Sequence, residues 1–178
     1  MKFESLPVNA PLRITSGYGE RTIDGKKEFH KGVDLGRNKE VNEVAAILAV
    51  KDGTVIRNVW NNARGWLVTI QHADGYTTLY QHLREASPKN PGTKVRAGEV
   101  IGVMGSTGFS KGVHLHFELA KGNETIDPTP FLKALVPHDW AKEYWDSAKR
   151  KGIIDGTRPR DYATREEVIT ILGRLGAL

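Results

Sequence analysis

The fold class is decided by the stretch WLVTIQHADGYTTLY at residues 66–80. Its two ends are runs of strand length, rich in β-branched and aromatic residues, and the turn residues at 73–75 separate them. Just upstream, the apolar runs 47–50 and 54–56 flank the residues Lys51-Asp52-Gly53, and Asp-Gly between apolar runs is a strong hairpin signal. Two consecutive hairpins predict an antiparallel, mostly β domain.

Strand signals run from Leu12 to about Leu119, where the segment HLHFEL at 114–119 alternates polar and apolar side chains. Two prolines in the segment 127–130 mark the end of the sheet domain. The sequence therefore predicts one domain over residues 1–132, followed by a linker at 133–137.

Beyond the linker the periodicity becomes helical. Trp140, Tyr144 and Trp145 fall on one face of a predicted helix, and the capping-box pattern at 164–167 announces a second helix. Residues 138–178 are thus predicted to form a small two-helix module, which is too short to bury much surface alone.

Composition narrows the chemistry that is available. The chain has 178 residues, a net charge of +5 and no cysteine, which excludes disulfides, thiolate metal sites and thiol nucleophiles. Any metal must bind His, Asp or Glu. The basic residues are interleaved with acidic ones and form no basic run, which favours a solvated surface and no nucleic-acid partner.

No segment approaches the roughly 20 consecutive apolar residues of a membrane span, so no membrane insertion is expected. The N-terminus as written also lacks the apolar stretch of about 7–15 residues that a secretory signal needs. A chain whose signal had been removed would look the same.

Four histidines and one aspartate fall in patterns that suit a metal. His30 and Asp34 have H-x-x-x-D spacing and can converge if Gly32 lets the backbone turn, while His114 and His116 project from one face of a strand. With His82 from a third strand end, this set suits Zn²⁺ and a water.

A histidine considered alone is more often a surface residue or a hydrogen-bonded core residue than a metal ligand. We keep that interpretation for His72 and His138, which have no partners in a recognisable pattern. The stretch GSTGFSKG at 105–112 lacks the ending of a phosphate-binding loop and is interpreted as a flexible cleft wall.

The order of H-x-x-x-D, Tyr80-Gln81-His82-Leu83, Gly-Ser-Thr-Gly and His-Leu-His-Phe-Glu-Leu resembles the lysostaphin-type zinc peptidases over roughly residues 11–132. The resemblance implies an antiparallel barrel-sandwich hybrid, also called the duplicated hybrid motif. It further implies one Zn²⁺ per chain. The implied site has ligands His30, Asp34 and His116 and a catalytic pair, His82 and His114.

Three protein ligands leave a fourth tetrahedral position open for water, as in catalytic zinc sites. With no H-E-x-x-H glutamate in the sequence, a histidine is the candidate base. Whether His82 or His114 takes the proton is left open.

Residues 138–178 resemble one S-layer homology module, which implies attachment to a secondary cell-wall polymer; a structural helical cap is the alternative. The leading hypothesis is a zinc endopeptidase that hydrolyses stem or cross-linking peptides of bacterial peptidoglycan. The expected setting is a phage or prophage endolysin that reaches the wall by holin-type release or host lysis.

Two other functions are kept open. One is a catalytically weak wall-binding protein that activates another hydrolase, and the other is a zinc protease acting on proteins. Departures from the family pattern at residues 21–29 and 111–113 leave the cleaved bond undecided.

Overall fold

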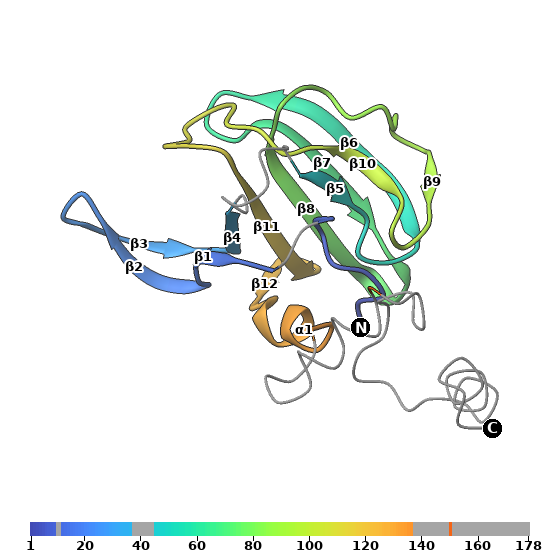
Figure 1. Ribbon diagram of the computed structural model, residues 1–178, viewed down its shortest axis with the longest axis horizontal. Coiled ribbons are helices and arrows are strands. Elements are labelled where there is room, and N and C mark those ends of the chain that lie inside the picture. The colour runs from blue at the N-terminus through green and yellow to red at the C-terminus, as the bar shows by residue number, and fades with distance from the viewer. Residues whose placement is uncertain (10–11, 37–44, 137–149, 151–178) are drawn as a thin grey trace. The chain divides into compact units, whose positions relative to one another are not determined.

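The computed structural model describes residues 1–9, 12–36, 45–136 and 150 (Figure 1). The chain divides into two units, Met1–Leu132 and Lys133–Leu178. The predicted helical module 138–178, including His138, lies outside the described residues except for Arg150, so the predicted domain limits and the two helices stay predictions. No helix in the described part of the chain combines the length and hydrophobicity needed to cross a membrane.

A large antiparallel sheet is the framework of the first unit, and it confirms the predicted mostly β fold. Its strands run in the order β1-β4-β11-β8-β7-β6-β9, and β12 pairs with β11. They are β1 (Ile14–Ser16), β4 (Val33–Gly36), β6 (Gly53–Asn61), β7 (Gly65–Gln71), β8 (Tyr76–Leu83), β9 (Lys94–Val95), β11 (His114–Lys121) and β12 (Glu124–Ile126).

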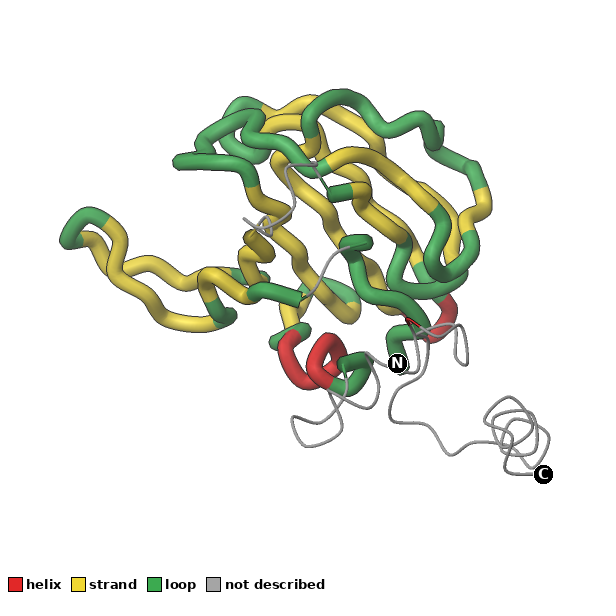
Figure 2. The backbone as a smooth tube through the Cα atoms, in the orientation of Figure 1, coloured by secondary structure: helices red, strands yellow, loops and turns green. Residues whose placement is uncertain are grey.

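Two small sheets and two short helices complete the described fold (Figure 2). Strand β5 (Ala46–Leu48) pairs with β10 (Val100–Val103), and β2 (Gly19–Ile23) pairs with β3 (Lys26–His30). The 3₁₀-helix η1 spans Ala73–Gly75 and the helix α1 spans Thr129–Lys133. Thus the predicted end of the sheet domain is also where a helix starts, with Pro130 in its first turn, where a missing N–H costs nothing.

The core lies between the β5–β10 pair and one face of the large sheet. A Cβ built on Gly102 of β10 would lie 2.7 Å from Cδ2 of Leu83 on β8, so the two layers are in close contact. The backbone N–H of Val50 donates to the hydroxyl of Tyr80 at 3.1 Å. On β11 the apolar side chains face this core, because Leu115, Phe117 and Leu119 are fully buried while the histidines alternate with them.

Of the two predicted hairpins, only the second is confirmed. Strands β7 and β8 pair directly, and Asp74 and Gly75 supply the turn with φ of 64° and 75°. The first is wrong, because β5 pairs with β10, and β6 pairs with β7 and β9.

The Asp52-Gly53 dipeptide fails as a hairpin turn because neither residue has the positive φ that a tight hairpin needs. Asp52 instead accepts a hydrogen bond at Oδ1 from the N–H of Ala97 (2.8 Å). A Cβ on Gly53 would lie 2.6 Å from the carbonyl oxygen of Gln71, so this glycine provides space between strands. The chain here crosses from one sheet to the other.

The same dipeptide makes a true hairpin elsewhere. Asp24 and Gly25 have φ of 51° and 78° and join β2 to β3, in the segment 21–29 that the sequence marked only as a departure from the family pattern. Figure 1 shows this hairpin extending away from the large sheet beside β1 and β4. It ends on His30 and so delivers a candidate metal ligand.

His72 is a hydrogen-bonded core residue, as predicted. Its Nδ1 donates to the carbonyl of Asp52 at 2.9 Å, and its Nε2 lies 2.7 Å from Oγ1 of Thr78. Burial lowers the pKa of His72 below its ordinary value, the Asp52 carbonyl opposes that shift, and the ammonium of Lys51 adds to it.

This shift predicts a pH dependence of stability. As pH falls below about 6.5, the unfolded chain binds a proton at His72 before the folded chain does, so the folded state loses stability. Above that pH, His72→Gln should cost about 1–3 kcal/mol by breaking buried hydrogen bonds. We expect the difference in melting temperature between wild type and His72→Gln to shrink as pH falls from 7.5 to 5. A difference that stays constant over this range would contradict the prediction.

Candidate metal centre and catalytic histidines

Three adjoining strand segments bring the predicted ligands together. His30 is the last residue of β3, Asp34 lies on β4, and His116 lies on β11 directly opposite Asp34 in the sheet register. Gly32 stands between His30 and Asp34, and a Cβ there would lie 2.3 Å from the carbonyl oxygen of Phe117. Gly32 has no positive φ, so it provides space for the neighbouring strand and not the special turn that the sequence suggested.

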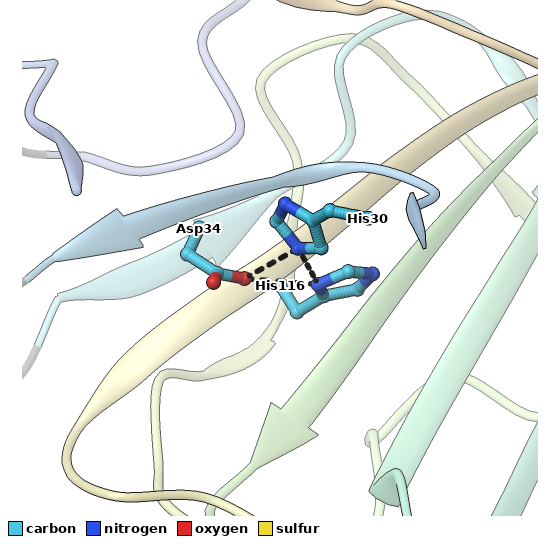
Figure 3. Close-up of side chains that lie close together, drawn as sticks. All are labelled: His30, Asp34 and His116. Carbon is cyan, nitrogen blue, oxygen red and sulfur yellow. Dashed lines mark hydrogen bonds and ion pairs between the residues drawn. The ribbon is translucent and has the colours of Figure 1, made fainter. Parts of the chain in front are cut away.

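The three side chains converge on one point, as Figure 3 shows. Oδ1 of Asp34 lies 2.9 Å from Nδ1 of His116 and 3.2 Å from Nε2 of His30. The two ring nitrogens are 2.9 Å apart. Both histidines are buried, and Asp34 is largely so.

Hydrogen bonds behind the two rings fix which nitrogen faces the centre. Nδ1 of His30 donates to the carbonyl of Gly17 at 2.6 Å, and Nε2 of His116 donates to Oε1 of Glu118 at 3.0 Å. Because these oxygens can only accept, the opposite nitrogens of the neutral rings carry lone pairs. Two lone pairs and a carboxylate oxygen therefore lie close together at a buried point. A cation bound between them would relieve their mutual repulsion.

The pKa shifts of Asp34 and His116 are consistent with positive charge at this point. Burial alone would raise the pKa of Asp34, but its close interactions with His116 and His30 outweigh burial and hold that pKa far below its usual range. Burial likewise acts to lower the pKa of His116, yet the carboxylates of Asp34 and Glu118 raise it above its ordinary value. Both shifts reflect the attraction between these carboxylates and positive charge on the neighbouring rings.

The donor set fits zinc. Two imidazole nitrogens and one carboxylate oxygen are typical catalytic-zinc ligands, and tetrahedral coordination at metal–ligand distances near 2.0–2.1 Å separates ligand atoms by about 3.3 Å. The observed separations of 2.9–3.2 Å approach that spacing. Among the described residues, His30, Asp34 and His116 are the set of His, Asp and Glu groups able to share one metal ion.

The two predicted catalytic histidines lie beside this centre. The rings of His82 and His114 are 4.8 Å apart between centroids, and Nε2 of His114 is 3.8 Å from Oδ1 of Asp34. Nδ1 of His82 donates to the carbonyl of Thr107 at 2.7 Å, and Nδ1 of His114 donates to that of Gly112 at 2.8 Å. In both neutral rings Nε2 is therefore left as the acceptor. Burial, the largest effect, lowers the pKa of His82, which favours its neutral form.

The backbone holds His82 in an uncommon conformation. Its φ is 61°, a left-handed value that costs a residue with a Cβ about 1–2 kcal/mol. The surrounding loops compensate, because the His82 N–H donates to the carbonyl of Arg64 at 3.0 Å. Thr107, whose carbonyl holds the His82 ring, is fixed through Oγ1 to the carbonyl of Leu83 at 2.6 Å. Such local strain is often found at functional sites.

An open pocket of about 550 Å³ adjoins the metal centre. Its lining includes Asp34 and His114, the arginines Arg13 and Arg21, and Lys111 from the loop 105–112. The loop that the sequence marked as a cleft wall therefore does border a pocket at the site.

Three site residues were missed by the sequence analysis. Glu118 accepts from His116 and from Nε2 of Gln81 at 2.9 Å, and Arg21 donates to Oδ2 of Asp34 at 3.0 Å. The i, i+2, i+4 alternation of His114, His116 and Glu118 on one strand face could have revealed Glu118. Gln81 and Arg21 fall in stretches that the sequence analysis quoted, but no sequence signal gives them a role, because their partners are set by strand register.

A centre of three protein ligands that leaves one coordination position open is the kind of site found in catalytic zinc enzymes, metallopeptidases among them. Residues 28–128, more than half of the chain, match peptidase family M23. The chain belongs to this family, whose metallopeptidases are zinc-dependent. The resemblance to lysostaphin-type peptidases is thereby confirmed.

Individual relatives support the same family assignment. Glycyl-glycine endopeptidase ALE-1 of Staphylococcus capitis is 32% identical over 124 residues, covering 66% of this chain and 33% of that protein. Stage II sporulation protein Q of Bacillus subtilis is 34% identical over 114 residues, covering 62% of this chain and 39% of that protein. The structure of the lysostaphin catalytic domain from Staphylococcus simulans superposes with a TM-score of 0.59 at 32% identity, covering 68% of this chain and 92% of that one.

The matched region spans only 26–39% of the length of the first curated relatives. The likeness therefore concerns the peptidase domain.

Proposed function

We propose that this protein is a zinc metalloendopeptidase that hydrolyses amide bonds in the stem or cross-linking peptides of bacterial peptidoglycan. The observation that carries the proposal is the convergence of two histidine lone pairs and the Asp34 carboxylate beside the His82–His114 pair. Relatives named as peptidoglycan and glycyl-glycine endopeptidases supply the substrate class.

In this proposal His30, Asp34 and His116 hold one Zn²⁺ per chain. When bound, zinc supplies Lewis-acid polarisation of the scissile carbonyl and lowers the pKa of a water to about 7. His82 and His114 present acceptor nitrogens at the same side of the site, where they can take a proton from the nucleophile and steady the developing negative charge. Glu118 orients His116 from behind.

The pocket beside the site supports a substrate that approaches from solvent. Asp34 and His114 line the pocket, which supports contact between an extended peptide and the proposed ligand and catalytic residue. Arg13 and Lys111 also line this pocket, and Lys111 is paired with Oδ2 of Asp24 at 2.7 Å.

A direct test uses purified, dye-labelled cell walls of several cross-link types. The zinc-loaded chain should release dye, a chelator should stop the release, and added zinc should restore it. Release that continues in chelator would contradict a metal-dependent reaction.

A catalytically weak wall-binding protein that activates another hydrolase is the second candidate. The similarity to stage II sporulation protein Q favours keeping it, because that name denotes no peptidase. Against it stands the complete set of five site residues in this chain. Dye release from walls by the purified chain alone would decide for the enzyme, whereas release only with an added hydrolase would decide for the activator.

We further propose an endolysin setting, with residues 138–178 as a wall-binding unit that resembles an S-layer homology module.

Deleting 138–178 should leave hydrolysis of a small soluble peptide largely intact, because no proposed site residue lies there. Activity on whole walls should fall by about tenfold or more, since tethering raises the local enzyme concentration. If the truncated chain digests walls as well as the full chain, wall targeting is wrong. If it loses the soluble activity too, the segment is a structural cap.

A further inference from the structure

Arg21 lies on the hairpin that ends at His30, and its side chain makes one hydrogen bond within that hairpin and two to neighbouring strands. Its Nη1 donates to Oδ2 of Asp34 at 3.0 Å and to Oγ of Ser16 at 2.9 Å. Its Nε donates to Oε1 of Glu28 at 2.6 Å, directly across the β2–β3 pair. The side chain is only 25% exposed, so solvent competes weakly for these contacts.

The contact with Arg21 leaves the two carboxylate oxygens of Asp34 with different partners. Oδ1 faces Nδ1 of His116 and Nε2 of His30, whereas Oδ2 is held by the guanidinium on the opposite side. A carboxylate held in this way has only one oxygen free to face a metal. Partners behind the ligands of a metal site commonly orient those ligands and tune metal affinity.

We propose that Arg21 is a positioning residue for the metal centre, holding Asp34 as a one-oxygen ligand and keeping a coordination position open. This inference rests on the proposed function, because it needs the zinc site at His30, Asp34 and His116. Arg21 acts on the metal through Asp34, and it also lines the pocket beside the site.

A purely structural role for Arg21 is the alternative, since its pair with Glu28 also stabilises an otherwise isolated two-stranded hairpin. The two roles are separable by substitution. Glu28→Gln weakens the cross-strand pair and leaves the Asp34 contact, whereas Arg21→Gln removes both. Lys27→Gln removes the same charge from an exposed position of the same hairpin.

The experiment measures the zinc dissociation constant of the full chain by competition with a chromophoric chelator, with the melting temperature of each zinc-free variant recorded alongside. Arg21→Gln should bind zinc roughly 10–100-fold more weakly than wild type. Glu28→Gln and Lys27→Gln should stay within about threefold, as surface substitutions usually do. Arg21→Lys, which keeps the charge, should lie between wild type and Arg21→Gln.

Cobalt substitution adds a readout of coordination. Visible absorption of Co²⁺ is strong in four-coordinate sites and weaker in five-coordinate ones, so Arg21→Gln should lower the intensity if Asp34 then offers both oxygens. Zinc affinity of Arg21→Gln within about threefold of wild type would overturn the proposal. So would an equal loss in Glu28→Gln, which would place the effect in the hairpin. A wild-type chain that binds no zinc would instead refute the proposed function.

Discussion

Replacing His30 with alanine is expected to abolish zinc binding. The substitution removes one of three ligands from a buried centre and leaves the lone pair of His116 and the carboxylate of Asp34 without the third donor of a tetrahedral site. Elemental analysis of the purified variant should show zinc near background, against one zinc per wild-type chain. Hydrolysis of wall peptides should disappear with the metal.

His72→Ala is the matched control, because His72 is also a buried, hydrogen-bonded histidine but belongs to the core. It should lower the melting temperature and keep its zinc. Full zinc occupancy in His30→Ala would show that the ligand assignment is wrong, and zinc loss in both variants would indicate a general effect of destabilisation.

The second large effect is expected from His82→Ala and His114→Ala. Each removes an acceptor nitrogen beside the metal centre while leaving His30, Asp34 and His116 in place. Turnover of a soluble peptide should fall by about 10²–10⁴-fold, the usual loss when a general acid or base is removed. The zinc content should stay at the wild-type level.

The two variants also test the division of roles within the site. Zinc loss in either one would make that histidine a ligand. Turnover unchanged in His82→Ala would remove His82 from the catalytic pair, despite the strained backbone that presents it.

The cluster of candidate residues could be expected from the sequence in part because its spacing is local, whereas the choice of His116 and not His114 as a ligand came from the family resemblance. His114 and His116 lie two residues apart on one strand, and His30 and Asp34 lie four apart around a glycine, so short-range geometry already limits where they point. The fold class could be predicted from the sequence for a related reason. All the signals for the β7–β8 hairpin lie within the short segment 66–80.

Features that depend on strand register could not be predicted in the same way. Arg21 reaches Asp34 only because the β2–β3 hairpin returns the chain beside β4, and Gln81 meets Glu118 only through the β8–β11 pairing. The Asp-Gly signal was ambiguous for a physical reason. At Asp24 it makes a tight turn with positive φ, whereas at Asp52 the side chain and carbonyl are engaged by Ala97 and His72 instead.

Mass spectrometry of the soluble fragments released from purified peptidoglycan tests the central claim most directly. The zinc-loaded full chain should release fragments with new amino and carboxyl termini within the stem or cross-linking peptides, with every glycosidic linkage intact, and Asp34→Ala should release none. Fragments cut only in the glycan, or an absence of new peptide termini with fully zinc-loaded protein on all wall types, would contradict the assignment of this chain as a peptidoglycan endopeptidase.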